Sequence, residues 1–268
     1  LLSAITLSCF ISGLSIVSIA QIPKWFSLSL TFIGIIFGIL YVIQALNHPR
    51  PVLDIKLLGR RPTFCLSIAS SSFLRIATGS IAFLLPLMLQ LGFQFSPITS
   101  GMITLSAALG AIFAKLGVTY LYNHFNFWRV LFYSSLFSAL FIAFIAFFTA
   151  STNYIMMVSI LFIGGLMRST FFSGINALTY GEIDIENMSH ATTLSTVAQQ
   201  ISLALGVAVG GMVLEILLKQ YPPKLTVFDF QCAFFIMGFV ALISPLLVLK
   251  LPRSVGNNLK KIALSKPR

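Results

Sequence analysis

Two arginines, a proline and several amides stand inside stretches of the sequence that are otherwise apolar. Arg75 is followed along one such stretch by Pro86 and Gln90. A charge within an apolar span costs about 2.5–3.5 kcal/mol on insertion scales and usually faces a bundle interior or a water-filled cavity. Proline removes a backbone donor, and lipid tolerates the freed carbonyl only where neighbours or water satisfy it. We therefore expect the helix that carries these three residues to line a substrate path.

A second apolar stretch places Arg168, Phe172 and Asn176 four residues apart, on a slowly turning helical face. A cation, an aromatic ring and an amide together suit an amphipathic organic substrate. A third stretch carries Gln199 and Gln200, whose amides need partners in lipid, and we expect one of them to line the path. Two alternatives stay open: the arginines pair helices and fix the bundle, and Phe172 is packing.

Lys115 is the third cation within an apolar stretch. Its long side chain can run along the helix and place the ammonium group at the membrane edge, near Tyr120. We expect Lys115 to do so, and therefore to stay out of the substrate path.

Motifs of enzymes and cofactor sites are absent from the sequence. His48, His124 and His190 lie at the edges of apolar stretches and far apart. The sequence contains no metalloprotease, serine-hydrolase or phosphate-loop motif. The three cysteines lie in separate apolar stretches without the CxxC spacing of a metal or redox site. We therefore expect no catalytic residue, no metal and no cofactor.

The amino-acid composition indicates whether the helices that carry these residues face water or lipid. Of 268 residues, 57% are hydrophobic and 9% are charged, against about 25% charged in a soluble domain. Such a chain cannot cover a surface that faces water, so the sequence predicts an integral membrane protein. The net charge of +11 comes from basic residues in loops and in the tail. This is the pattern of membrane topology, and it argues against nucleic acid as a partner.

The apolar stretches predict an all-α polytopic membrane protein with eight transmembrane helices, each of about 20 residues or more. A linker that contains Pro and Arg separates the second helix from the third, and a basic tail follows the eighth. The chain begins at Leu1 inside an apolar run, and we expect it to lack its natural beginning. The predicted spans are residues 1–20, 26–45, 64–91, 97–120, 128–148, 154–178, 191–218 and 228–251.

The distribution of Lys and Arg sets the expected orientation. With the linker inside, eleven of the 17 basic residues lie inside and three lie outside. We therefore expect the linker and the tail to face the cytoplasm of a bacterial inner (plasma) membrane. The eleven are Arg50, Lys56, Arg60, Arg61, Arg129, Lys250, Arg253, Lys260, Lys261, Lys266 and Arg268.

The last six spans divide into two sets of three, residues 64–149 and 154–251. Because three is an odd number, the second set must run with the opposite membrane orientation. That is the arrangement of an inverted repeat, the usual architecture of secondary transporters. The spacing therefore predicts a six-helix transporter domain at 64–251.

Several stretches together resemble the EmrB/QacA type of the major facilitator superfamily, the 14-helix drug:proton antiporters. One is Ile81–Gln90 (IAFLLPLMLQ), followed by Gly92, Ser96-Pro97 and Gly101. The other matching stretches are Pro51–Phe64 (PVLDIKLLGRRPTF), Arg168–Asn176 (RSTFFSGIN), and Gln199-Gln200 with Gly206 and Gly210.

The resemblance implies a domain plan. Residues 1–46 would be the two additional central helices of the family, 47–63 a cytoplasmic linker, 64–251 the six-helix C-terminal half of the transporter, and 252–268 a basic cytoplasmic tail. It also implies that the six-helix N-terminal domain, which carries most of the proton coupling, is a missing partner.

We therefore expect the C-terminal part of a proton-coupled exporter of amphipathic organic compounds, inactive alone. Its expected partners are the lipid bilayer, a small amphipathic substrate, protons and the N-terminal domain. Two alternatives stay open. One is a facilitator of a metabolite or organic anion, because the spans hold three cations. The other is a membrane scaffold or fragment that does not transport.

Overall fold

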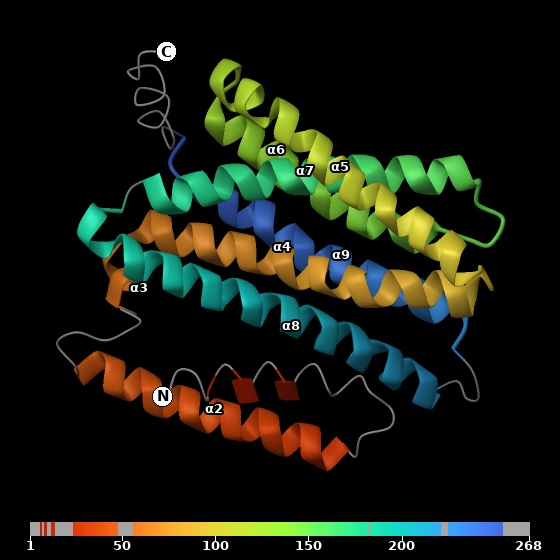
Figure 1. Ribbon diagram of the computed structural model, residues 1–268, viewed down its shortest axis with the longest axis horizontal. Helices are drawn as coiled ribbons and strands as arrows, with labels where there is room; N and C mark the ends of the chain where they lie inside the picture. Colours follow the sequence, from red (N-terminus) through yellow and green to blue (C-terminus); the bar gives the residue numbers. More distant parts are fainter. Residues whose placement is uncertain are drawn as a thin grey trace.

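The computed structural model of the protein describes residues 6, 8, 9, 12, 13, 24–47, 56–181, 183–220 and 225–253. Within these residues every regular element is a helix, so the predicted all-α class is confirmed. The main helices, shown in Figure 1, are α2 (Lys24–Asn47), α3 (Lys56–Arg60), α4 (Pro62–Leu87), α5 (Pro97–His124), α6 (Phe127–Phe144), α7 (Tyr154–Gly181), α8 (Met188–Gln220) and α9 (Val227–Leu249).

Six of the eight predicted spans are helices long and apolar enough to cross a membrane. They correspond to α4 with the turn that follows it, and to α5, α6, α7, α8 and α9. The second predicted span lies in α2. Over the described residues its apolar stretch, Trp25–Leu40, is shorter than the six helices long enough to cross a membrane. The first predicted span lies almost wholly outside the described residues. The protein is therefore a polytopic membrane protein with six spans visible in the structure.

Local sequence signals explain where α4 ends and α5 begins. Pro86 lies inside α4, which ends at Leu87. The chain continues directly as a π-helical turn, Met88–Gly92. Gln94 then adopts a left-handed φ of 59° and reverses the chain. The Ser96 hydroxyl accepts a hydrogen bond from the Thr99 N–H at 3.1 Å, with Pro97 at the first helical position. Ser96 is therefore the N-cap of α5.

The outside of the bundle is strongly apolar, as expected for a chain whose solvent is lipid. On α5, Ile98 and Leu116 are 77% and 79% exposed, and further large hydrophobic side chains are exposed on α6 and α9. A water-facing helix would carry charged residues at such positions. The buried core lies between α4, α6, α7 and α9, where its largest side chains are Phe171, Phe230 and Phe234.

Glycines let two helix pairs approach to backbone contact. A Cβ atom on Gly110 of α5 would collide with the carbonyl of Phe162 on α7, and one on Gly165 of α7 would collide with the carbonyl of Ala107. The same arrangement joins α4 and α8, where Gly206 faces the Ile76 carbonyl. Small residues at such crossings allow the close packing on which helix association in lipid depends.

The packing pattern relates the two sets of three helices. In the first set α4 packs against α8 and α9 of the second, and in the second set α7 packs against α5 and α6 of the first. The third helices, α6 and α9, pack on each other. Exchanging the two sets leaves this pattern unchanged, which is the pairing that an inverted repeat requires. The repeat and its boundaries stay a prediction.

One end of the bundle gathers the linker and several loops. Arg61, at the start of α4, makes an exposed ion pair with Asp184 between α7 and α8 at 2.8 Å. Leu57 of α3 is buried in a small cluster with Phe64 and Ile183. The part of the linker that the structure describes therefore packs against the ends of α4 and α8.

The described residues before α2 contact that helix. The hydroxyl of Ser27 donates a hydrogen bond to the carbonyl of Gly13 at 2.6 Å, and a Cβ on Gly13 would meet Thr31. Figure 1 shows α2 running alongside α8, on the side away from α7. The division of residues 1–46 into two additional helices stays a prediction.

Candidate functional site

Arg75 and Phe172, predicted on separate spans, lie in contact in the middle of the bundle. The guanidinium carbon of Arg75 on α4 is 4.2 Å from the ring centroid of Phe172 on α7. Both side chains are half-buried, and the Nε of Arg75 has no hydrogen-bond partner among the described residues. A cation over a ring face is attracted by the ring quadrupole, with an energy of about 0.5–2 kcal/mol. The pair leaves part of the guanidinium donor capacity unused.

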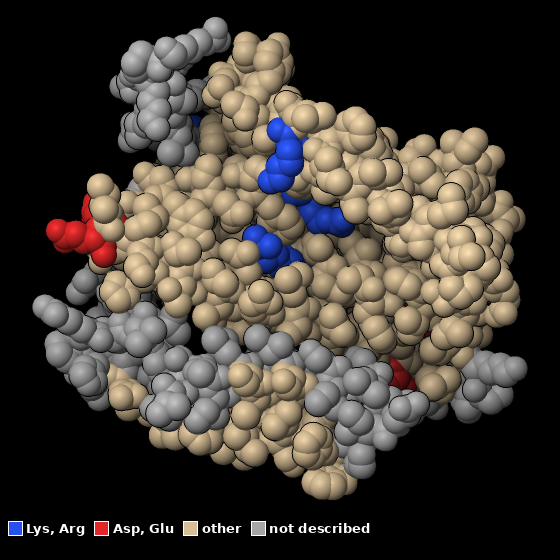
Figure 2. All heavy atoms as spheres, in the orientation of Figure 1, with Lys and Arg blue, Asp and Glu red and all other residues tan. Residues whose placement is uncertain are grey.

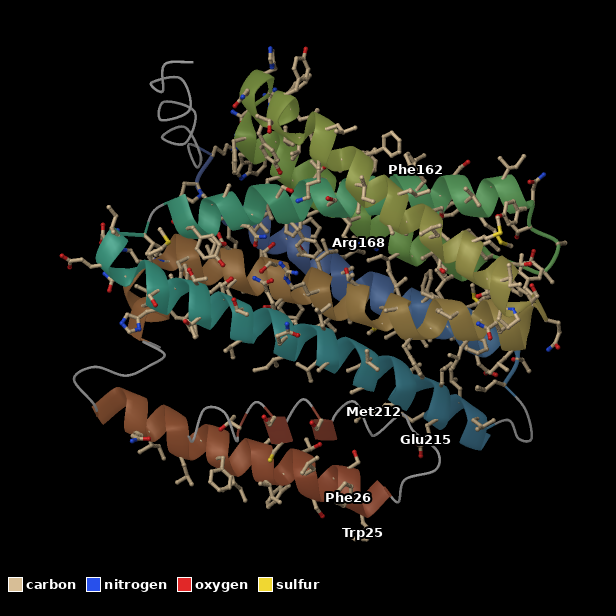
Figure 3. The ribbon with its side chains drawn as sticks, viewed as in Figure 1. Trp25, Phe26, Phe162, Arg168, Met212 and Glu215 are labelled. Atoms are coloured by element: carbon tan, nitrogen blue, oxygen red, sulfur yellow. The ribbon has the colours of Figure 1, made fainter. Side chains whose placement is uncertain are left out.

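Arg168 stands one helical turn before Phe172 on α7. Figure 3 labels it near the middle of the bundle, between the ribbons of α7 and α4 in this view. It borders a small cavity of about 20 Å³ together with Ile81, Ala107, Ser138 and Phe141 from three other helices. That volume is enough for about one water molecule. The side chain therefore lies between helices and does not face acyl chains alone.

Lys115 joins the same region, which corrects the expectation that it would reach the membrane edge. Its ammonium Nζ donates a hydrogen bond to the hydroxyl of Ser173 on α7 at 2.9 Å. Ser173 in turn donates to the carbonyl of Ser169, and Ser169 donates to the carbonyl of Ala111 on α5, both at 2.9 Å. The close packing of α5 on α7 brings the ammonium to a hydroxyl, so it need not leave the bundle.

Sequence analysis missed Ser173 as a site residue. A serine within an apolar helix usually bonds its own backbone, so the residue type alone carried no signal. Its position did carry one, because Ser169 and Ser173 are four residues apart and therefore share one face of α7. That face lies about 100° around the helix from the face of Arg168 and Phe172.

The helices that carry the three cations contain no acid. The sequences of α4, α5, α6 and α7 contain no Asp or Glu. Figure 2 shows the basic side chains gathered near the middle of one face, in the region where Figure 1 places α4, α5 and α7, and acidic side chains at its margins. The basic residues of those three helices are Arg75, Lys115 and Arg168. This part of the protein is therefore suited to bind negative charge or an electron-rich ring.

The remaining predicted residues do not join this cluster. Pro86 and Gln90 lie 11 and 15 residues beyond Arg75, which at the helical rise is about 16 and 22 Å along the axis. They therefore lie away from the cluster along the helix axis, and their place in a substrate path stays a prediction. Asn176 is half-buried one turn beyond Phe172.

The two glutamines of α8 have different surroundings. Gln199 is half-buried and its amide Nε2 donates to the hydroxyl of Ser195 at 3.2 Å, one turn earlier on the same helix. Gln200 is exposed. Of the pair, Gln199 already has a partner within its helix, and Gln200 has its amide on the outer surface of the described bundle.

This site has the groups of a binding site and lacks a nucleophile paired with a base. Among the described residues no group of three or more His, Cys, Asp or Glu could hold a metal ion. Cations, a ring and hydroxyls between packed apolar helices can orient a small ligand, and can separate when helices move. Fold and site together define the class of membrane transport proteins built from six-helix halves.

The comparison with known families names that class. The family model described as Major Facilitator Superfamily matches residues 64–266. The match covers more than half of the chain, and it begins where the predicted six-helix domain begins. The chain belongs to the major facilitator superfamily, and it is a transporter-family protein.

Curated relatives in enteric bacteria carry the name of a candidate multidrug resistance protein, MdtD. The protein from Escherichia coli O6:H1 is 31% identical over 194 residues, which are 72% of this chain and 41% of the relative. The one from Escherichia coli O157:H7 is 28% identical over 234 residues, 85% of this chain and 49% of the relative. The protein from Escherichia fergusonii is 31% identical over 194 residues. The chain spans less than half the length of these relatives.

Proposed function

We propose that this chain is the C-terminal part of a proton-coupled exporter of amphipathic organic compounds, of the 14-helix EmrB/QacA-like type. The observation that carries the proposal is the contact of Arg75 with Phe172 in the middle of the membrane-spanning bundle. A cation and a ring held side by side between apolar helices offer both polar and aromatic contacts to an amphipathic molecule.

The family and the relatives support the same proposal. Members of this superfamily move substrate by rocking two bundles about a site near the bilayer midplane. The relatives are named for multidrug resistance and are more than twice as long as the matched segment. The chain would then supply one of two bundles and would not transport alone. Its linker and tail would lie on the cytoplasmic side of the bacterial inner membrane.

Efflux of a fluorescent aromatic amphipathic compound from cells tests the proposal. Three strains are compared: one with the longest open reading frame that contains this chain, one with the chain alone, and one with an empty vector. We expect faster efflux only in the first, and loss of that efflux when a protonophore collapses the proton gradient. Efflux that persists without the gradient would contradict proton coupling. Equal efflux in all three strains would favour the scaffold.

A facilitator for organic anions is a second candidate function, favoured by one observation. Arg75, Lys115 and Arg168 lie on helices that carry no carboxylate, so the site has unbalanced positive charge. In the low dielectric of the bundle, such charge attracts anions strongly.

Uptake and counterflow in proteoliposomes separate the two candidates. For the exporter, aromatic amphipathic compounds are accumulated and a di- or tricarboxylate does not compete. For the facilitator, a labelled carboxylate exchanges across the membrane and aromatic amphipathic compounds have no effect on the exchange.

A further inference from the structure

Two adjoining hollows lie at the end of the bundle where α6 begins. The first has a volume of about 380 Å³ and lies between α5, α6 and α7. Its apolar lining comes from Leu121, Phe125, Val130, Tyr133, Phe137 and Met167. The second has a volume of about 280 Å³ and is lined by Asn126, Trp128, Arg129 and Arg253. Asn126 and Arg129 line both, so the two hollows adjoin at these residues.

The apolar hollow, which we call the groove, opens on the outer surface of the bundle. Phe125, Tyr133 and Phe137 are exposed at 55%, 52% and 44%, although they are large apolar or aromatic side chains. None of the cations of the candidate transport site lines it. A groove of this kind in a membrane protein is filled by something apolar from the bilayer side, because water gains nothing there.

The polar hollow, which we call the basic pocket, carries two arginines and an interfacial tryptophan. The guanidinium of Arg253 lies 5.8 Å from the ring centroid of Trp128. Within the described part of the chain neither Arg129 nor Arg253 has a carboxylate partner, and the indole Nε1 of Trp128 is buried without an acceptor. Unused donors of this kind fit a phosphate group, which Arg binds with a planar pair of N–H groups.

The two hollows also lie at the right depth for one ligand that has a charged head and apolar chains. Arg129 and Trp128 are at the first turn of α6, and Arg253 follows the end of α9, so all three stand at a membrane edge. The groove runs from that edge along α6, because Val130, Ser134 and Phe137 line it in succession. Tryptophan is typical of the headgroup level.

We propose that the basic pocket and the groove form one binding site for an anionic diacyl phospholipid. The phosphate lies between Arg129 and Arg253, and one acyl chain lies along the groove beside Tyr133 and Phe137. Basic pockets between transmembrane helices bind anionic headgroups, and each nearby Lys or Arg contributes about 1 kcal/mol to surface attraction. The bilayer supplies this ligand continuously, so the site is occupied whenever the protein is in its membrane.

Native mass spectrometry of the whole chain, purified in detergent and mixed with defined lipids, tests the site. We expect phosphatidylglycerol to remain bound at much lower concentration than phosphatidylcholine with the same acyl chains. Arg129→Gln and Arg253→Gln should each reduce phosphatidylglycerol binding about fivefold. Lys250→Gln is the matched control, because Lys250 is exposed near the same end of α9 and lines neither hollow. It should leave binding within twofold.

A second variant tests the groove without changing charge. Val130→Trp fills the groove and should reduce binding of a long-chain phosphatidylglycerol more than that of a short-chain one. Melting curves show whether the variant folds, and if it does not, the two arginine variants decide alone.

Four results would overturn the proposal. The first is equal retention of the two lipids, and the second is binding unchanged in both arginine variants. The third is displacement of the lipid by millimolar inorganic phosphate, which would make the basic pocket a site for free anions. Displacement of phosphatidylglycerol by a lipophilic cation would also contradict it, since the groove would then be a substrate site.

Discussion

Arg75 is held by a contact that only an aromatic ring can supply. Its partner Phe172 lies on another helix, and the distance of 4.2 Å from the guanidinium carbon to the ring centroid is within the range of cation–π attraction. Arg168 and Lys115 add two more charges without adding an acid.

Replacing Phe172 by Leu keeps an apolar side chain and removes the ring. We expect this change to raise the KM for the exported compound roughly 2- to 30-fold, which is the cation–π energy of about 0.5–2 kcal/mol expressed as a ratio. Phe172→Tyr keeps the ring and should stay within twofold of the parent. The measurement is the dependence of efflux rate on the concentration of the compound, in cells that express the longest open reading frame containing this chain. Identical constants in Leu and Tyr variants would remove the ring from substrate binding.

Residue types predicted part of this cluster. Arg75, Arg168 and Phe172 stand out because a charge or a polar neighbour within an apolar helix is rare and costly. The partner of Lys115 could not be predicted, because it depends on how closely α5 packs on α7 and on where Ser173 then lies. The part of Pro86 and Gln90 in a substrate path stays a prediction, because they lie about 16 and 22 Å along the helix axis from Arg75.

At the scale of the helices, glycines determine how near the backbones come. Gly110 on α5 faces the Phe162 carbonyl, and Gly206 on α8 faces the Ile76 carbonyl. Ala at either position must push two helices apart, and overpacking of this kind costs about 1–3 kcal/mol. We expect Gly110→Ala and Gly206→Ala to lower the melting temperature of the purified protein.

Gly117→Ala is the control for those variants. A Cβ at Gly117 of α5 would meet nothing within 4 Å, so the change should be neutral or stabilising, by up to about 1 kcal/mol from helix propensity. Equal melting temperatures for Gly110→Ala and Gly117→Ala would show that the α5–α7 crossing is not packed as described.

Helix caps give a second prediction at this scale. Asp229 is buried, and its carboxylate accepts hydrogen bonds from the backbone N–H and the hydroxyl of Thr226 at 2.7 and 2.9 Å. Asp229→Ala should destabilise the protein by about 1 kcal/mol, the usual cost of a lost cap. Asp184→Ala, which removes the exposed ion pair with Arg61, should cost less. Thermal melting of both variants ranks them, and the reverse order would contradict the cap.

Helix positions were the part of the fold most open to prediction from the sequence. Runs of about 20 apolar residues in lipid leave the backbone no alternative to helix, so the spans from residue 64 onward match α4 to α9 within a few residues. The π-helical turn at Met88–Gly92 and the burial of Leu57 in the linker were not predicted. Both depend on contacts with other helices, which local apolar patterns do not contain.

At the scale of the whole molecule, the six described spans belong to a superfamily whose members have two bundles. The chain spans less than half the length of its MdtD relatives, and its cationic site lies on one bundle. The charge distribution predicts that the linker and the tail share the cytoplasmic side. The contact of Arg253 with Trp128 joins the end of α9 to the start of α6 at one membrane edge.

Reporter fusions in the intact reading frame test that orientation. A cytoplasm-active reporter placed after Arg253 should be active, and the same reporter placed between α4 and α5, at Gln94, should be inactive. The opposite pattern would invert the protein in the membrane and would contradict the use of basic residues as topology signals here.

The central claim is that Arg75 and Arg168 take part in transport and do not merely fix the bundle. The most direct measurement is the initial efflux rate per protein molecule in cells that express the longest open reading frame containing this chain. Arg75→Gln and Arg168→Gln are compared with Arg61→Gln, which removes an exposed arginine outside the site. We expect a loss of tenfold or more in the first two at unchanged protein abundance, and parental efflux in the third. Parental efflux in both site variants would contradict it.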